Sequence, residues 1–377
     1  MNPQSRASLR HGTLAALVLC VSHAPGDARA QADVQVYARL NVSAEYVRAS
    51  AALDPAATRT SQVRVSNNRS VVGLRGGEDL GGGMRAIFQI EGTLAPDTGA
   101  GEIARRDTRV GLDSDFGTLF AGHWVTAYNG ATSGLDPFYP TTAGYMSIIG
   151  NGSAAAVDNV NNTYSFDRRQ ANSVHYWSRP WRGLGLRLTH GLAEERPAGG
   201  ARPSLTSLAA VYEAGPWYAT LAHERHHEYQ GPGGSDSGTR LAVARRFSHR
   251  FGQTRVALLA ERLEYETPAG ELARNAVYLS VSHQAGPHGV RLGVAVAGDG
   301  HGAAGNRVGF VRGGAGTGAT HVTLGYDYTL SKRTSVYGYA TLLDNEANAA
   351  YDFAINGLGP APGATLKGAV LGLRHSF

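Results

Sequence analysis

The fold is decided by one stretch of sequence, Gly368-Ala369-Val370-Leu371-Gly372-Leu373-Arg374-His375-Ser376-Phe377. Leu371 and Leu373 fall on one face of an extended chain, whereas Gly372 and Arg374 fall on the other. A period of two residues is typical of a β-strand with one apolar and one polar face. We therefore expect this segment to be a strand with an apolar environment on one face and an aqueous environment on the other.

The same alternation, flanked by turn residues, recurs along the chain. It predicts sixteen strands, at 33–47, 64–76, 83–94, 105–112, 117–124, 169–177, 183–192, 204–214, 217–229, 238–247, 253–266, 275–284, 290–297, 320–330, 335–344 and 365–377. Beyond residue 30 no segment approaches the ~20 apolar residues of a membrane helix. A bilayer otherwise admits only a closed barrel. We predict an all-β fold, a 16-stranded antiparallel transmembrane β-barrel.

The connections between these strands alternate in length. Short turns, such as 79–82 and 248–252, alternate with longer Gly- and Pro-rich loops, such as 193–203 and 298–319. Short turns at one rim and long loops at the other are expected of an outer-membrane barrel. A soluble β-sandwich would share the strand pattern, but aromatic residues at strand ends, such as Trp217, favour the barrel.

The N-terminal segment reads as a secretory signal peptide at residues 1–30. Arg6 and Arg10 precede an apolar run, and the small residues around Arg29 provide a cleavage site. The remaining residues, 31–377, form one barrel domain. The lone cysteine, Cys20, lies in the signal peptide, so disulfides and cysteine metal sites are excluded from the mature chain. The net charge of +5 would become +3 once these residues, with three arginines and one aspartate, are removed.

One connection, at about 125–168, is far longer than the others. Loops of more than ~15 residues without alternation are usually functional or disordered. This one contains a stiff aromatic turn, Asp136-Pro137-Phe138-Tyr139-Pro140. We expect it to fold into the barrel and to narrow the lumen.

Several segments together resemble the general porins of Gram-negative outer membranes, a family of trimeric 16-stranded channels. They are Gly73 to Glu91, Val110 to Gly122, Asn172 to Tyr176 and Gly372 to Phe377. The resemblance implies a water-filled homotrimer in which the third loop constricts each pore. Its partners would be small hydrophilic solutes, inorganic ions and outer-membrane lipid. No cofactor, metal or nucleic acid is expected.

The resemblance also implies a constriction with a basic wall and an acidic side. By position, the resemblance places Arg39, Arg106 and Arg168 or Arg169 on the basic wall and Asp136 on the acidic side. We add Arg69 and Arg75 to the basic wall and Glu91 to the acidic side. Two positions depart from the family pattern, since Val71 and His123 stand where an arginine is common. Arg69 shares a strand face with Val71 and Arg75 and is expected to compensate.

Fixed guanidinium groups on one wall favour anions, so we expect a general diffusion channel with a weak anion preference and no enzymatic activity. The alternative is that these arginines merely pair with Glu91, Glu45 or Asp167. Three other functions stay open: a solute-specific channel of the same architecture, a barrel-anchored surface adhesin, and a barrel-embedded hydrolase.

Two motifs look like sites of chemistry. The stretch His223-Glu224-Arg225-His226-His227 matches the zinc-protease pattern, which requires a helix. On the strand predicted here, His223 and His227 would lie ~13 Å apart, too far to share one zinc ion. The glycine pattern at 300–305 matches a dinucleotide fingerprint, but no helix is expected after it. We interpret both as parts of strand ends and loops.

Overall fold

The computed structural model describes residues 33–54 and 60–377, so the predicted signal peptide lies outside the described residues. The elements, in chain order, are β1 (Asp33–Ala49), β2 (Ser61–Asn67), β3 (Ser70–Gly81), β4 (Met84–Ala95), β5 (Ala100–Glu102), β6 (Thr108–Ser114), β7 (Gly117–Val125), α1 (Ala127–Gly130), η1 (Ser133–Leu135), η2 (Tyr145–Ser147), β8 (Ala154–Val157), β9 (Arg168–Trp177), β10 (Leu184–Gly191), β11 (Ser204–Ala214), β12 (Trp217–His227), β13 (Ser235–His249), β14 (Gly252–Thr267), β15 (Gly270–Ala285), β16 (His288–Ala297), β17 (Arg307–Val308), β18 (Val311–Arg312), β19 (Ala319–Ser331), β20 (Thr334–Asn345) and β21 (Thr365–Ser376). In this described part of the chain, no helix is long and apolar enough to cross a membrane.

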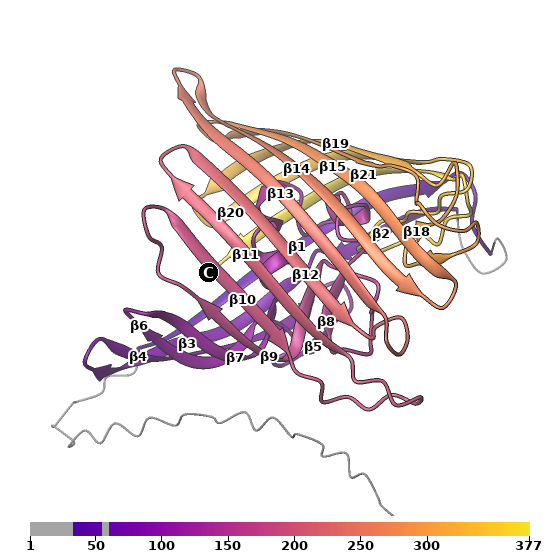
Figure 1. Cartoon of the computed structure of the whole chain (residues 1–377). Coiled ribbons are helices and arrows are strands. Elements are labelled where there is room, and N and C mark those ends of the chain that lie inside the picture. The colour runs from indigo at the N-terminus through magenta and orange to yellow at the C-terminus, as the bar shows by residue number, and fades with distance from the viewer. Residues whose placement is uncertain (1–32, 55–59) are drawn as a thin grey trace, which may run out of the picture.

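The strands form a closed, tilted cylinder (Figure 1). One edge of β1 pairs with β21, from Arg39 opposite Ser376 to Ala49 opposite Leu366, and its other edge pairs with β2 and β3. Together β2 and β3 make one span, as do β5 and β6, while β8, β17 and β18 lie in connections. The described residues therefore form sixteen antiparallel spans, which confirms the predicted fold class.

The cylinder is apolar on its outer face and polar on its inner face, which is the opposite of the arrangement in a soluble protein. Outward positions such as Leu221, Leu241 and Leu258 are exposed, whereas inward neighbours such as Glu224 and Arg240 are buried. Large continuous apolar surfaces are rare on soluble proteins. Because every strand edge is also paired within the ring, the outer surface suits hydrocarbon, in which unpaired backbone groups are costly.

Some details of the strands differ from expectation. The predicted continuous strand 64–76 is wrong, because β2 ends at Asn67 and β3 begins at Ser70. Arg69 adopts a φ of 56° between them, a left-handed conformation that interrupts a regular ladder. The buried Asn68 turns inward and donates a hydrogen bond to the hydroxyl of Ser43 at 2.8 Å.

Candidate functional site

The connection between β7 and β9 is a folded segment, residues 126–167, and we call it the inner segment. It carries α1, η1, η2 and β8, and most of its residues up to Ala154 are buried. Its partners are inward-facing residues of distant strands. The hydroxyl of Thr142 donates to Glu45 of β1 at 2.9 Å, and the hydroxyl of Ser280 on β15 donates to the carbonyl of Leu135 at 2.8 Å. The inner segment therefore packs against the inner face of the wall.

A buried ion network fastens the inner segment to the β13–β15 side. The carboxylate of Glu261 accepts from Arg240 Nε at 2.7 Å and from Arg274 Nη2 at 2.8 Å, and all three side chains are fully buried. The same carboxylate accepts from the backbone N–H of Gly150 at 3.0 Å and from the hydroxyl of Tyr128 at 3.1 Å. One carboxylate thus forms ion pairs with two arginines and holds two points of the inner segment.

Asp136 closes a turn within the inner segment. Its carboxylate accepts from the backbone N–H groups of Phe138 at 3.0 Å and Tyr145 at 2.8 Å, and from the hydroxyl of Tyr278 at 2.6 Å. Burial raises the pKa of Asp136 to about 6 despite these bonds. The carboxylate therefore organises the turn and docks it on β15, and Asp136 is not among the residues that line the cavity described next.

A cavity of about 390 Å³ lies between the inner segment and the opposite wall. The wall contributes Arg39 of β1, Arg106 just before β6, and Arg169 of β9, and the inner segment contributes Tyr139 and Pro140. The remaining lining residues are Asp107, Trp124, Val125, Thr126, Ala127, Gly130, Ser133, Trp177 and Arg187. The structure thus brings together three of the six arginines that the sequence placed on the basic wall.

These arginines are partly compensated by carboxylates. Arg106 Nε donates to Glu91 at 2.9 Å, and Arg169 Nε donates to Asp107 at 2.6 Å. Arg39 donates instead to the backbone carbonyl of Arg69 at 3.1 Å. Glu91 therefore lies on the same side as the arginines rather than across the lumen from them. The lining still holds four arginines and a single aspartate, so its formal charge is positive.

Arg69 and Arg75 lie outside that lining. Arg69 bridges to the inner segment, where it donates to the hydroxyl of Tyr139 at 3.0 Å and to the hydroxyl of Ser153. Arg75 is exposed near the short-turn rim and donates to the side chain of Gln35 at 2.9 Å. Arg69 is thus positioned to hold Tyr139 at the edge of the cavity.

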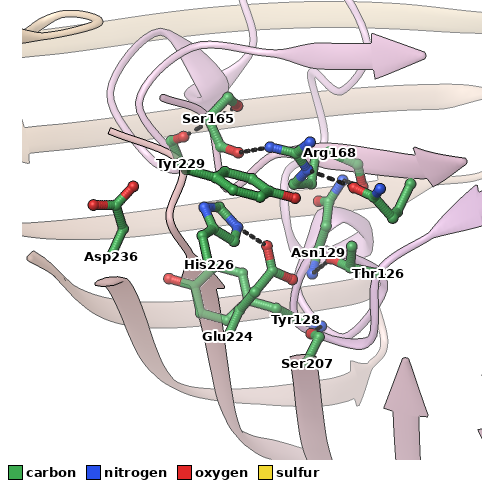
Figure 2. A network of polar contacts seen from close by, with 12 residues as sticks. Thr126, Tyr128, Asn129, Ser165, Arg168, Ser207, Glu224, His226, Tyr229 and Asp236 are labelled. Carbon is green, nitrogen blue, oxygen red and sulfur yellow. Dashed lines mark hydrogen bonds and ion pairs between the residues drawn. The ribbon is translucent and has the colours of Figure 1, made fainter. Parts of the chain in front are cut away.

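Arg168 belongs to a separate buried network, although it adjoins Arg169 in sequence (Figure 2). Its guanidinium group donates to the carbonyls of Asp158 and Ser165 and lies 5.0 Å from the ring centre of Tyr229. The ring of His226 stacks between Tyr229 and Phe166. Arg168 therefore secures the end of the inner segment.

The zinc-protease pattern lies on β12, as the sequence analysis expected. His223 and His227 are exposed on the outer face, whereas Glu224 and His226 point inward and form a hydrogen bond of 2.9 Å. Within residues 33–54 and 60–377, no group of three or more His, Cys, Asp or Glu side chains is placed to hold a metal ion.

The sequence analysis did not single out Trp124, Trp177 and Arg187 as lining residues. A signal existed for Arg187, because it stands opposite the apolar positions Leu186 and Leu188 on β10. Trp177 lies at the short-turn end of β9, where an aromatic residue is readily attributed to the membrane interface. A signal existed for Trp177 as well, because strand parity places it on the face of the buried His175 and opposite the exposed Tyr176.

A closed barrel with an apolar exterior, a polar interior and a charged cavity inside defines a membrane channel protein. The family model described as "Gram-negative porin" matches residues 13–348. The chain therefore belongs to the Gram-negative porin family, and it is an outer-membrane β-barrel protein that forms a porin channel.

Curated relatives support this assignment. Outer membrane porin protein 32 of Delftia acidovorans is 26% identical over 370 residues, covering 96% of this chain and 99% of the relative. Major outer membrane protein P.IA of Neisseria meningitidis serogroup C is 35% identical over 78 residues, 20% of each chain.

Solved structures agree in fold. An anion-selective porin from Comamonas acidovorans superposes with a TM-score of 0.74 at 21% identity, covering 92% of this chain and all of the other. The trimer form of OmpT from Vibrio cholerae gives a TM-score of 0.62 at 14% identity, covering 92% and 99%.

Proposed function

We propose that this porin is a general diffusion channel for small hydrophilic solutes, with a weak preference for anions and without chemical turnover. The observation that carries the proposal is the cavity lining, where four arginines face a single aspartate. Because arginine keeps its charge at any physiological pH, this field is permanent. The low-dielectric walls around it concentrate the field, while salt screens it over roughly 8 Å. The anion-selective neighbour from Comamonas acidovorans is consistent with this sign.

The reversal potential across a planar bilayer that separates two concentrations of potassium chloride tests the preference. For the native protein we expect a reversal potential with the sign that indicates chloride selectivity. For Arg39→Gln we expect a smaller reversal potential, because the variant removes a guanidinium group from the cavity lining. Arg48→Gln is the matched control, because Arg48 is an exposed residue of the same strand. Cation selectivity of the native channel would refute the proposed preference.

We also propose that the channel works as a homotrimer embedded in outer-membrane lipid. A shallow outer groove, formed by small residues of β1, β20 and β21, supports this. Its lining includes Ala44, Gly338, Ala340 and Ala369, together with larger residues such as Leu324 and Leu371. Small residues on a lipid-facing surface allow close approach of a neighbouring barrel, as they do between membrane helices.

Sedimentation in detergent tests the assembly. Ala369→Arg is expected to shift the native trimer towards monomer, whereas Ala260→Arg, on the exposed outer face of β14, leaves the trimer intact. Both variants place one arginine on the lipid face, so any general effect of a charge at that face is the same in both. A difference between them reports the contact at the groove. A native protein that sediments as a monomer would contradict the proposed trimer.

A further inference from the structure

We propose that the cavity between the inner segment and the wall contains a subsite for small aromatic carboxylates of the benzoate class. The inference rests on the proposed function, since the ligand is a solute in transit through an anion-preferring pore. It goes further by naming a chemical class of solute that the channel retains longer than other anions of equal charge.

The carboxylate would meet the arginine side of the cavity. Arg106 donates to Glu91 through Nε at 2.9 Å, and within residues 33–54 and 60–377 its two terminal Nη groups make no hydrogen bond. Arg39 uses one terminal group, Nη2, for the carbonyl of Arg69, which leaves its other terminal group, Nη1, to donate towards the cavity that it lines. A guanidinium group offers five N–H donors in a planar fork that matches a carboxylate. Arg39 and Arg106 therefore keep donors for a ligand.

The ring would meet a different side of the same cavity. The indoles of Trp124 and Trp177 both line it, together with Arg187. The guanidinium carbon of Arg187 lies over the ring of Trp177, 5.5 Å from its centre, so a cationic group and an aromatic group adjoin in this part of the lining. Aromatic rings pack favourably on indole edges and on guanidinium planes. Chloride, acetate and other anions without a ring cannot use this surface.

The cavity dimensions agree with a ligand of this kind. A volume of about 390 Å³ lies in the range of small-ligand pockets, roughly 300–1,000 Å³. It accommodates a single ring with one carboxylate and some accompanying water. The cavity is bounded on the other side by Tyr139 and Pro140 of the inner segment, so a solute that passes between wall and segment contacts both surfaces.

Single-channel chloride currents of the native protein test the subsite, with sodium benzoate and sodium cyclohexanecarboxylate as added blockers. The two anions share charge and approximate size, and only benzoate is aromatic. We expect benzoate to block at a concentration about three- to ten-fold lower than cyclohexanecarboxylate, the range given by one aromatic contact. Equal block by the two anions, or no block by either, would overturn the proposal.

Variants separate the two surfaces. Trp177→Leu is expected to reduce the blocking ratio to about one, and Trp177→Phe to retain most of it. If Trp177→Leu fails to fold, Trp124→Leu replaces it. Trp181→Leu is the matched control, because Trp181 is an exposed tryptophan of the β9–β10 turn, and the native ratio is expected there. A native ratio that persists in both cavity tryptophan variants would overturn the subsite.

The reversal potential in potassium chloride is measured on the same channels. This quantity reports the anion preference and not the aromatic contact. Loss of anion preference would refute the proposed function, whereas anion preference with equal block by the two acids would refute only the subsite.

Discussion

Replacement of Glu261 by glutamine is expected to loosen the inner segment. The carboxylate of Glu261 is fully buried and is the shared acceptor for Arg240 and Arg274. An amide of the same size removes the negative charge and leaves two buried guanidinium groups without a counter-charge. Removal of one partner from a buried ion pair typically destabilises a protein by about 3–5 kcal/mol.

Part of this loss of stability weakens the attachment of the inner segment to the wall, because the network also contacts that segment. Besides the two arginines, Glu261 holds the N–H of Gly150 and the hydroxyl of Tyr128. Arg240 and Arg274 themselves donate to Thr132 at 2.7 Å and to the carbonyl of Ile148 at 3.0 Å. Once the network is unbalanced, four attachment points of the inner segment weaken together.

Two assays measure the consequence. Single-channel recordings of Glu261→Gln are expected to show an unsteady open current, and limited proteolysis in detergent is expected to cleave within residues 126–167 faster than in the native protein. Glu264→Gln is the control, because Glu264 lies on the same strand but about half exposed. Its pair with Arg262 is a surface pair, worth at most about 1 kcal/mol. Native-like current noise and native-like cleavage in Glu261→Gln would refute the anchoring role.

Three further predictions concern stability and metal binding. Because burial raises the pKa of Asp136 from 3.8 to about 6, the folded protein holds this proton more tightly than the unfolded chain, so stability is expected to fall by roughly 3 kcal/mol as the pH rises from about 4 to about 7. The difference in unfolding free energy between the native protein and Asp136→Asn should follow this slope, and a pH-independent difference would contradict it. Gly325→Val is expected to destabilise the barrel by about 1–3 kcal/mol, since a Cβ at Gly325 would lie 2.7 Å from the rings of Phe138 and Tyr339; an unchanged melting temperature would refute this. Elemental analysis of the purified protein is expected to find no stoichiometric zinc, because His223 and His227 lie four residues apart on a strand, ~13 Å from each other, and a stoichiometric content would contradict that geometry.

The sequence predicted the barrel well because a membrane-spanning strand is encoded locally. Each strand must present one face to lipid and one to water, so positions such as Leu371 and Gly372 report their environment directly. The interruption at Arg69 was not predictable in this way, since a left-handed residue there depends on inward contacts of Asn68 with Ser43, which is 25 residues away.

The candidate site was predicted less completely, because its geometry depends on the inner segment. Arg39, Arg106 and Arg169 were expected from the resemblance to the porin family, and they do line one cavity. The position of Asp136 depends on the path of a loop without periodicity, and its carboxylate turns to Tyr278 instead. Arg168 and Arg169 are neighbours in sequence, and only the packing of the segment end decides which of them reaches the cavity.

Closure of the cylinder has a consequence for biogenesis. Because β1 is paired with β21, the seam joins the earliest and latest spans of the described chain. Without β21, the backbone groups of β1 and β20 that pair with it would lie unpaired in hydrocarbon. A stably inserted barrel therefore requires β21, which makes this span a checkpoint for assembly.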